Sequence, residues 1–246
     1  MGQPMNYDDY AAQYASTRWA VPWILSALDR RVDGLESGAT VVEIGCGTGN
    51  YIIALSKKYP GLACMGFDLS REMLAVARSR SQIVQLCQGD ADGNFPCDSA
   101  EAGFLFMVDV VHHLQNHDNL FREAVRVLKP SGAFMIVTDS EENIRNRSLT
   151  RFFPEILEIE LKRYPTIDAL NTAAERAGLK CVGQEPAEGD IELDEGFIAK
   201  LEQKCSSAMR LISPDAHRAG VLRVREAKGR GEKWRSCYTA ISYMKR

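Results

Sequence analysis

Three glycines occupy alternate positions directly after a short run of apolar residues. The run VVEI, residues 41–44, leads into Gly45, Gly47 and Gly49 within the sequence VVEIGCGTGN. Glycine lets the backbone bend sharply and lets a ligand lie against it, and a helix that begins there points its N–H groups at the ligand. Nicotinamide and flavin enzymes place G-x-G-x-x-G after a strand, whereas position 50 here is Asn50. The loop therefore predicts a nucleotide-like ligand, and its spacing weighs against a dinucleotide.

Three acidic residues accompany this loop at the ends of consecutive apolar runs. Glu43 lies two residues before Gly45, Asp68 ends the run LACMGFD, and Asp90 follows the run IVQLC. A carboxylate after the second strand can accept hydrogen bonds from both ribose hydroxyls, and one after the third can accept from an adenine amino group. Each acid alone could equally cap a helix or a turn. Together they predict one crevice that is shaped for an adenosine.

A second group of residues could move a proton. His112 and His113 follow the apolar run 104–108, and Asp139 ends the next apolar run, 133–138. Histidine removes protons near neutral pH, and a His–Asp pair across two neighbouring strand ends is geometrically possible. The alternative is that both histidines cap or pack the helix that begins there. The spacing of His112, His113 and His117 cannot converge on one helix face, so we expect no metal site.

The elements that must position these residues alternate between strands and helices. Periodicity predicts helices over 8–31 with a break at Pro22, 50–59, 70–80, 120–128, 166–177 and 196–211, and irregular helix over 141–164. It predicts strands over 40–44, 62–67, 83–87, 104–108, 133–138, 179–184 and 234–244, with a turn at 129–132. This alternation predicts an α/β fold in which crossover helices flank a mostly parallel, doubly wound sheet.

Composition sets broad limits. With 246 residues and 45% hydrophobic residues, the chain fits a single globular domain. A net charge of −3 argues against a nucleic-acid partner, and we expect the basic run 223–235 to be a solvated face. The absence of a long apolar run predicts no membrane span, and the first residues do not resemble a secretory signal. Seven cysteines without a CxxC pair predict reduced thiols in a cytoplasmic protein.

The motifs VVEIGCGTGN, FDLSREMLAVAR, QGDADGNFPCDSA and VDVVHHL together strongly resemble class I S-adenosylmethionine-dependent methyltransferases of the small-molecule type, the group related to the ubiquinone/menaquinone-biosynthesis enzymes. The resemblance is close over residues 35–139 and loose elsewhere. It implies a Rossmann-like seven-stranded sheet whose last strand is antiparallel. It also divides a single domain, 1–246, into an N-terminal helical cap (1–34), a cofactor-binding half (35–139) and a lid and acceptor-side half (140–246).

The resemblance also implies where S-adenosylmethionine binds. The residues that it places at the cofactor are Tyr14, Arg18, Glu43, Gly45, Cys46, Gly47, Gly49, Asp68, Leu69, Asp90, Ala91, Met107 and Val108. The glycines would border the methionine part, Asp68 would hold the ribose, Leu69 would pack on the adenine, and Asp90 with Ala91 would meet the adenine edge. Met107 or Val108 would offer a carbonyl to the cofactor's amino group. Arg18 could pair with the methionine carboxylate, or the aromatic residues around it could simply pack.

The predicted function is transfer of a methyl group to a small-molecule acceptor, free or carrier-bound, by direct displacement. Such a reaction depends mainly on positioning, and a general base is needed only for some acceptors. The sequence leaves O-, N- and C-methylation open. Two rival interpretations are a regulatory module that binds the cofactor without turnover and a nicotinamide-dependent oxidoreductase.

Overall fold

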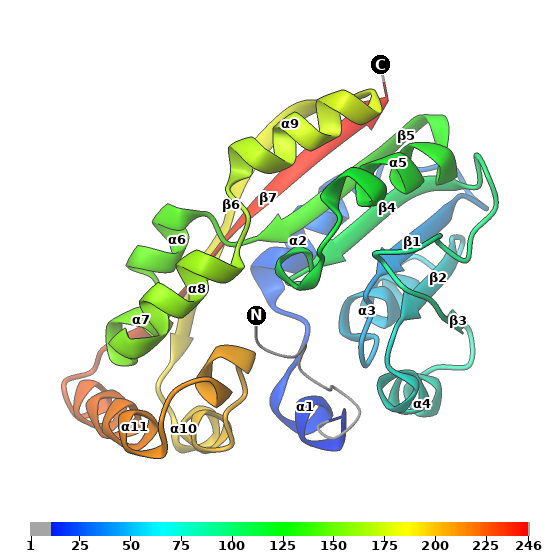
Figure 1. The fold of residues 1–246 in the computed structure, drawn as a ribbon. Helices are drawn as coiled ribbons and strands as arrows, with labels where there is room; N and C mark the ends of the chain where they lie inside the picture. Colours follow the sequence, from blue (N-terminus) through cyan, green and yellow to red (C-terminus); the bar gives the residue numbers. More distant parts are fainter. Residues whose placement is uncertain (1–10, 246) are drawn as a thin grey trace.

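A single seven-stranded sheet forms the centre of the protein in a computed structural model that describes residues 11–245 (Figure 1). Its strand order is β3-β2-β1-β4-β5-β7-β6. The strands are β1 (Thr40–Ile44), β2 (Ala63–Asp68), β3 (Gln85–Gln88), β4 (Ala102–Val108), β5 (Leu128–Thr138), β6 (Leu179–Glu192) and β7 (Lys233–Lys245).

Strand direction in the sheet follows the prediction. The neighbours from β3 through to β5 pair in parallel, and β7 lies between β5 and β6 and is antiparallel to both. The predicted fold class, a Rossmann-like, mostly parallel sheet with an antiparallel last strand, is therefore confirmed. Because the parallel strands all point the same way, the ends of β1, β2, β3 and β4 lie side by side at one edge of the sheet.

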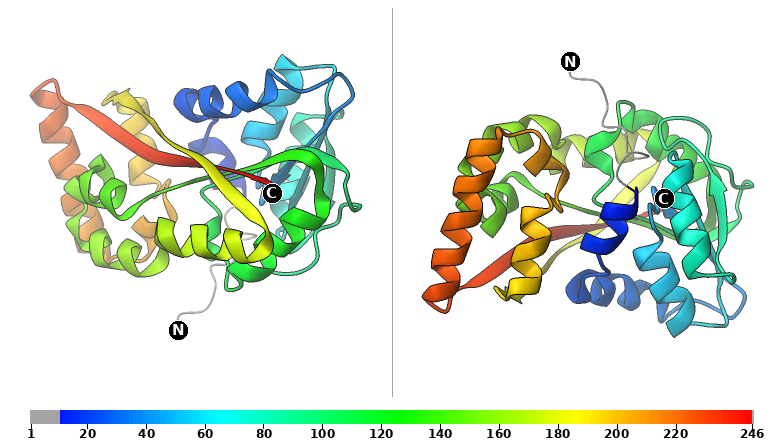
Figure 2. Two further views of the ribbon diagram at one scale, coloured as in Figure 1. Left: turned by 90° about the horizontal axis from the view of Figure 1, so that it is seen from above. Right: turned by 90° about the horizontal axis from the view of Figure 1, so that it is seen from below.

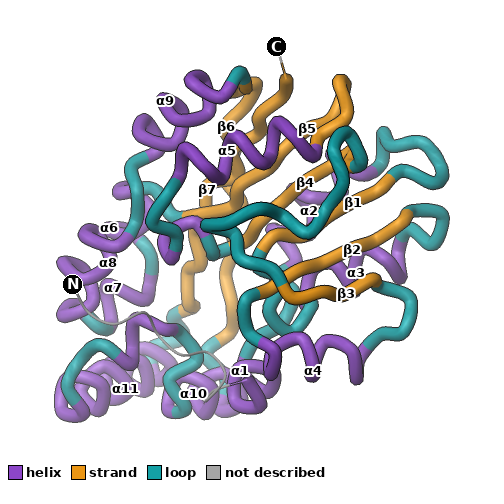
Figure 3. The backbone as a smooth tube through the Cα atoms, turned by 45° about the vertical axis from the view of Figure 1, so that its right-hand side comes forward, coloured by secondary structure: helices purple, strands orange, loops and turns teal. Residues whose placement is uncertain are grey.

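Helices cover both faces of the sheet (Figure 2). On one face lie α2 (Pro22–Val32), α3 (Asn50–Lys58) and α4 (Arg71–Arg80), and on the other lie α5 (His117–Val127) and α9 (Ile167–Ala177). The remaining described helices are α1 (Ala11–Thr17), the 3₁₀ turn η2 (Val111–His113), α6 (Glu141–Asn146), α7 (Ser148–Phe152), η3 (Pro154–Ile156), α8 (Leu157–Arg163), α10 (Glu195–Glu202), η4 (Ser207–Arg210) and α11 (Pro214–Gly229). Figure 3 shows α6, α7, α8, α10 and α11 gathered beside one end of the β6–β7 ribbon.

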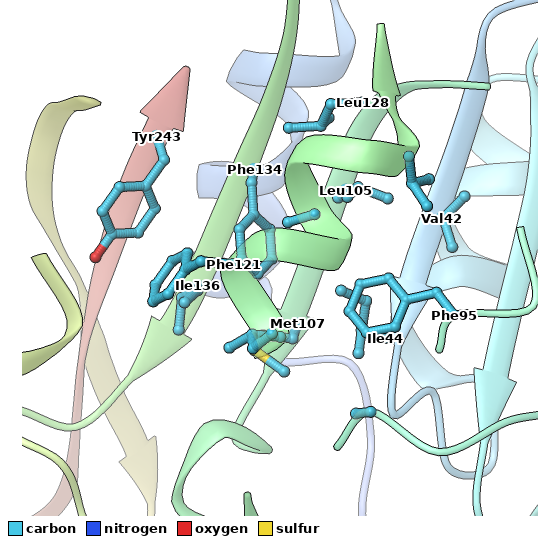
Figure 4. Close-up of a cluster of buried hydrophobic side chains, with 14 of the residues drawn as sticks. Val42, Ile44, Phe95, Leu105, Met107, Phe121, Leu128, Phe134, Ile136 and Tyr243 are labelled. Carbon is cyan, nitrogen blue, oxygen red and sulfur yellow. The ribbon is translucent and has the colours of Figure 1, made fainter. Parts of the chain in front are cut away.

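Alternating residues of the central strands fill two separate cores. Val42, Leu105 and Phe134 pack under α5 and α9, as the close-up in Figure 4 shows, whereas Val41 and Phe104 pack under α2 and α3. Each fully buried side chain of this size contributes roughly 1.5–3 kcal/mol. Because strand side chains alternate between faces, a sheet covered on both sides requires continuous apolar runs such as the one in β4.

The C-terminal half differs from the prediction in several places. The predicted helix 196–211 ends at Glu202, because Lys204 adopts a left-handed backbone with φ +55°, and only the short η4 follows. The helix α11 was not predicted, although Ser213 caps it and Pro214 opens it, which is a usual start signal. Much of the basic run 223–235 lies on α11. The predicted turn 129–132 is part of β5.

The N-terminal region forms two helices, as the predicted break at Pro22 indicates. Residues 18–21 separate α1 from α2, and the first residues of the predicted helical region 8–31 lie outside the described part of the chain. Pro22 does begin the second helix, as predicted. A third apolar cluster joins α7, α10 and α11 around Phe153, Phe197 and Trp234. The chain beyond β5 therefore builds a small core of its own beside the sheet.

Candidate active site

The glycine loop bends as its composition predicts. Gly45, Gly47 and Gly49 have φ values of +67°, +51° and +76°, in the left-handed region that favours glycine. A side chain at Gly45 would meet Val110 at 2.7 Å. The loop is also tied to β2, because the N–H of Cys46 donates to the carbonyl of Phe67. The loop therefore holds a fixed shape at the edge of the sheet.

Asp68 lies directly beside this loop. One carboxylate oxygen accepts from the N–H of Gly47 at 2.8 Å, and the other accepts from the N–H of Ser70 at 2.9 Å. Leu69 follows, and 65% of its surface is exposed, which is unusual for a leucine. An acid held by two N–H groups and an uncovered apolar side chain next to it fit a ribose and an adenine ring.

Asp90 and Ala91 lie at the end of the neighbouring strand β3. The carboxylate of Asp90 accepts from the N–H of Asp92, and Asp90 is exposed while Ala91 is buried. Asp92 in turn accepts from the N–H groups of Gln115 and Asn116 at the start of α5. The loop after β3 is therefore held against another element, with Asp90 at its open side.

Glu43 lies beneath the glycine loop. It is buried, and its carboxylate accepts from the N–H of Ile52 in the first turn of α3 at 2.9 Å. Burial raises the pKa of Glu43 well above its usual value. On the other side of the loop, Arg80 donates to the side-chain oxygen of Asn50 at 2.7 Å and to the carbonyl of Thr48. The asparagine at position 50 thus helps to anchor the loop.

The segment around α1 covers the loop from above. The ring of Tyr14 lies 4.0 Å from the position that a side chain on Gly47 would occupy. Arg18 follows α1 and extends towards the end of β4, where it forms an ion pair with Asp109 at 2.9 Å. Both residues line the same pocket as Val108. Met107, the preceding residue of β4, is fully buried.

Asp109 is a site residue that the sequence did not single out. It follows β4 with φ +57°, an uncommon conformation for a residue with a side chain. Its carboxylate accepts from Tyr164 at 2.7 Å and from Arg18 at 2.9 Å. Burial alone would raise the pKa of Asp109, but nearby His112, Arg18 and Tyr164 outweigh burial and lower it. One carboxylate therefore joins the segment after α1 to the segment after α8.

The predicted pair of His112 with Asp139 does not form. His112 is buried and stacks on the ring of Tyr164, and its nearest carboxylate is Asp109, with 3.7 Å between Nδ1 and Oδ1. Within residues 11–245 neither ring nitrogen of His112 has a hydrogen-bond partner. Burial lowers the pKa of His112 well below its usual value and that of His113 to about 4. Both rings are therefore neutral at physiological pH.

Asp139 pairs instead with a residue of the segment that follows it. Arg147, between α6 and α7, donates to both Asp139 and Glu160, and Glu160 also accepts from Arg163 at 2.7 Å. Asp139 is fully buried, and burial raises its pKa to about 7. Arg147 lies only eight residues further along the chain than Asp139. Arg147, through Asp139 and Glu160, therefore holds α6–α8 on the end of β5.

A pocket begins beside the loop and extends under these covering segments. It encloses about 110 Å³, which is less than a drug-sized ligand needs. Near the loop its walls include Tyr14, Asn50 and Asp109, and elsewhere they include the packed rings of Trp19, Phe197 and Trp234. One end is thus polar and the other largely aromatic.

The structure also bears on metal binding and on membrane crossing. The described residues hold no group of three or more His, Cys, Asp or Glu side chains placed to bind a metal ion. In the same part of the chain no helix combines the length and apolar character that crossing a membrane requires.

Comparison with known proteins points to one kind of enzyme. Residues 42–136 match the family model of a methyltransferase domain. The chain is 35% identical over 102 residues to a trans-aconitate 2-methyltransferase of Azoarcus sp. strain BH72, covering 42% of this chain and 40% of that one. It is 28% identical over 152 residues to a tRNA (carboxymethyluridine(34)-5-O)-methyltransferase of Arabidopsis thaliana, covering 60% and 35%. The matches thus span less than half the length of these relatives.

Solved structures share the whole fold. A putative methyltransferase from an antibiotic biosynthesis pathway of Anabaena variabilis has a TM-score of 0.71 at 19% identity, covering 92% of this chain and 98% of that one. The phosphoethanolamine N-methyltransferase 2 of Haemonchus contortus, in complex with S-adenosylhomocysteine, has a TM-score of 0.62 at 20% identity, covering 97% and 57%. The predicted resemblance to class I S-adenosylmethionine-dependent methyltransferases is therefore confirmed, and S-adenosylmethionine is the cofactor that these findings support.

Proposed function

We propose that this protein transfers a methyl group from S-adenosylmethionine to a small-molecule acceptor. The observation that carries the proposal is the edge where β1, β2 and β3 end together. There a fixed glycine loop, the carboxylate of Asp68, the exposed Leu69 and the open side of Asp90 lie on neighbouring strands. This set matches the parts of an adenosine joined to an amino acid.

Each residue of the site has a proposed role in binding. Gly45, Cys46, Gly47 and Gly49 would border the methionine part, and Asp68 would hold the ribose. Leu69 would pack on the adenine, Asp90 and Ala91 would meet its edge, and Met107 or Val108 would offer a carbonyl to the amino group. Tyr14 would close over the bound cofactor, and Glu43 would hold α3 in place beneath it. When bound, the cofactor supplies an electrophilic methyl group.

The acceptor would occupy the pocket beyond the loop. Residues 140–246 would form its lid. Tyr164, the residue that follows α8, supports this role because it donates a hydrogen bond to Asp109 in the pocket wall. A pocket of this size suits a small molecule better than a polynucleotide. The basic residues of α11 support the same view, because Arg225 and Lys228 both pair with Glu195 and present no free basic stripe. A carrier-bound acceptor would also need to enter through the lid.

Neither histidine is suited to be the general base. His112 is not among the described residues that line the pocket, and burial lowers the pKa of His113 to about 4. We therefore propose that both histidines support the pocket wall, where His112 stacks on Tyr164. All seven cysteines are free thiols, which supports a reducing compartment such as the cytoplasm.

Binding of S-adenosylhomocysteine tests the cofactor site directly. We expect calorimetric titration to detect binding of this product and none of NADH. Asp68→Asn should weaken the binding by roughly 10- to 100-fold, because a charged acceptor of hydrogen bonds is worth about 1.5–3 kcal/mol. The matched control is Asp118→Asn, which removes an exposed carboxylate that pairs with Arg176 on the surface. Equal affinities for both variants would contradict the proposed site.

Turnover separates an enzyme from a module that only binds. Incubation with methyl-tritiated S-adenosylmethionine and a metabolite extract should move label into new products. Binding of S-adenosylhomocysteine without any label transfer would favour the regulatory module, and binding of NADH alone would favour an oxidoreductase.

A further inference from the structure

The carboxylates in the pocket wall already have partners on every oxygen. Asp109 accepts from Tyr164 with one oxygen and from Arg18 with the other. Glu160 accepts from Arg163 with one oxygen and from Arg147 with the other. Each oxygen of these two acids, which are the acidic residues of the described pocket lining, therefore already accepts one hydrogen bond, which leaves less capacity to bind the N–H groups of an amine acceptor.

The donors in the same wall are not all used. The guanidinium group of Arg18 donates one N–H to Asp109 and makes no other hydrogen bond within the described chain. Nε of Arg147 is buried and has no partner among residues 11–245. The hydroxyl of Tyr238 also lines the pocket, and the described residues provide no hydrogen bond to it. Buried polar groups are normally paired, so the unpaired Nε of Arg147 is unusual, and the partly exposed Arg18 and Tyr238 can donate to a ligand in the pocket.

The charge of the pocket points in the same direction. Among the described residues of its lining, Arg18 and Arg147 balance Asp109 and Glu160, and the third arginine, Arg235, pairs with Glu188. A bound sulfonium cofactor adds positive charge. A second cation would therefore be repelled, whereas an anion would be attracted and would find the unused donors.

We infer that the acceptor is a carboxylic acid, held by Arg147, Tyr238 and Arg18 in this donor-rich pocket and methylated on a carboxylate oxygen to give its methyl ester. The inference rests on the proposed methyl transfer and names its substrate class. A carboxylate oxygen bonds to the methyl carbon while the carbon–sulfur bond breaks and leaves its electron pair on sulfur. A carboxylate is already ionised at neutral pH, so no proton moves.

This chemistry agrees with two other features of the site. No general base is required, which fits the buried, neutral histidines. The product ester has lost the negative charge that attracted it to the guanidinium groups, so its affinity for the pocket falls. The aromatic far end, with Trp19, Phe197 and Trp234, suits an apolar body attached to the acid. Arg18 is also the residue predicted to hold the cofactor's own carboxylate, but Arg147 and Tyr238 do not depend on that role.

The stability of the product to alkali tests the inference without knowledge of the acceptor. Label transferred from methyl-tritiated S-adenosylmethionine to a metabolite extract is treated with alkali, which hydrolyses methyl esters to volatile methanol. We expect most of the transferred label to become volatile. Label that stays in N-, C- or ether-methylated products would overturn the carboxylate inference and leave methyl transfer intact. The absence of any transfer would overturn both, and calorimetry with S-adenosylhomocysteine would then show whether the cofactor site survives.

A single hydroxyl tests the donor role. Tyr238→Phe keeps the ring and removes the hydroxyl, so the extract concentration that gives half-maximal formation of alkali-labile label should rise about 10-fold. Maximal rate should change less, and affinity for S-adenosylhomocysteine should not change. The matched control is Tyr59→Phe, whose hydroxyl contacts Asp29 and Asp33 on the surface. An unchanged half-saturating concentration in Tyr238→Phe would overturn the assignment of this residue.

Discussion

At the scale of single residues, backbone conformation decides which side chains the site allows. Gly45 and Asp109 both adopt left-handed backbone, and they flank the same space at the ends of β1 and β4. Glycine accepts this conformation without cost, whereas Asp109 requires compensation from its partners Arg18 and Tyr164. An uncommon conformation at an aspartate with two fixed partners marks a position where geometry matters more than local stability.

Gly45→Ala tests the fixed shape of the loop. The substitution adds left-handed strain and places a methyl group 2.7 Å from Val110, so we expect a loss of about 1–3 kcal/mol in the free energy of unfolding. Affinity for S-adenosylhomocysteine should fall as well. Chemical denaturation and calorimetry measure the two effects.

Gly34→Ala is the control for this substitution, because an added methyl group there meets nothing within 4 Å and the backbone is not left-handed. The double variant Gly45→Ala with Val110→Ala should relieve the contact but keep the strain. A Gly45→Ala protein as stable as the Gly34→Ala control would show that the loop tolerates another shape.

At the scale of elements, charged groups join α6–α8 to the sheet. Arg147 bridges Asp139 at the end of β5 and Glu160 on α8, and all three are buried. Buried ion pairs contribute little net stability, but losing one partner leaves an uncompensated charge and costs about 3–5 kcal/mol. This cluster therefore fixes the position of α6–α8 on β5 more than it adds to the stability of the whole protein.

The elevated pKa of Asp139 predicts a pH dependence. Burial raises this pKa from 3.8 to about 7, so between these values the folded protein keeps a proton that the unfolded chain releases. The stability that this group contributes is present below pH 3.8 and is lost as the pH rises through about 7. When the pH rises from about 5 to about 8, the unfolding free energy of the wild type should therefore fall relative to that of Asp139→Asn. Denaturation curves across this range measure it, with the exposed Asp118→Asn as control. A difference that stays constant with pH would contradict the shift.

The sequence predicted the strands of the sheet better than the site that they support. The apolar run in β4 and the glycines after β1 encode their structure locally, so strands and loop were predicted correctly. The role of Asp109 depends on Arg18 and Tyr164, which lie 91 and 55 residues away in the chain. The pairing of Asp139 was wrong for the same reason, since spacing does not show that Arg147 would turn back onto β5. Contacts between distant segments are set by packing, which periodicity does not contain.

At the scale of the whole molecule, the proposed cofactor and acceptor regions belong to different parts of the chain. The loops after β1, β2 and β3 surround the proposed cofactor site, whereas the segment after α1, the lid helices and the start of β7 surround the pocket. A ligand in one region should therefore stabilise that region selectively.

Hydrogen exchange can detect this division. Saturating S-adenosylhomocysteine should slow exchange in residues 45–50, 68–70 and 89–93 and in α1, because a bound ligand suppresses local opening. Exchange in α11 should change little, since this helix packs in the third apolar cluster away from the loop. NADH provides the negative control. Protection that appears only in α11 would contradict the location of the site.

The position of β7 also affects how the sheet can be assembled. This strand comes after every other strand in the chain, yet it lies between β5 and β6 and pairs with both. Until it has left the ribosome, β5 has an open edge and β6 has no neighbour, and unpaired edges invite association with other chains. A nascent chain can therefore form its glycine loop early, but its sheet is complete only after residues 233–245 have been synthesised. Until then a chaperone could protect the unpaired edge of β5.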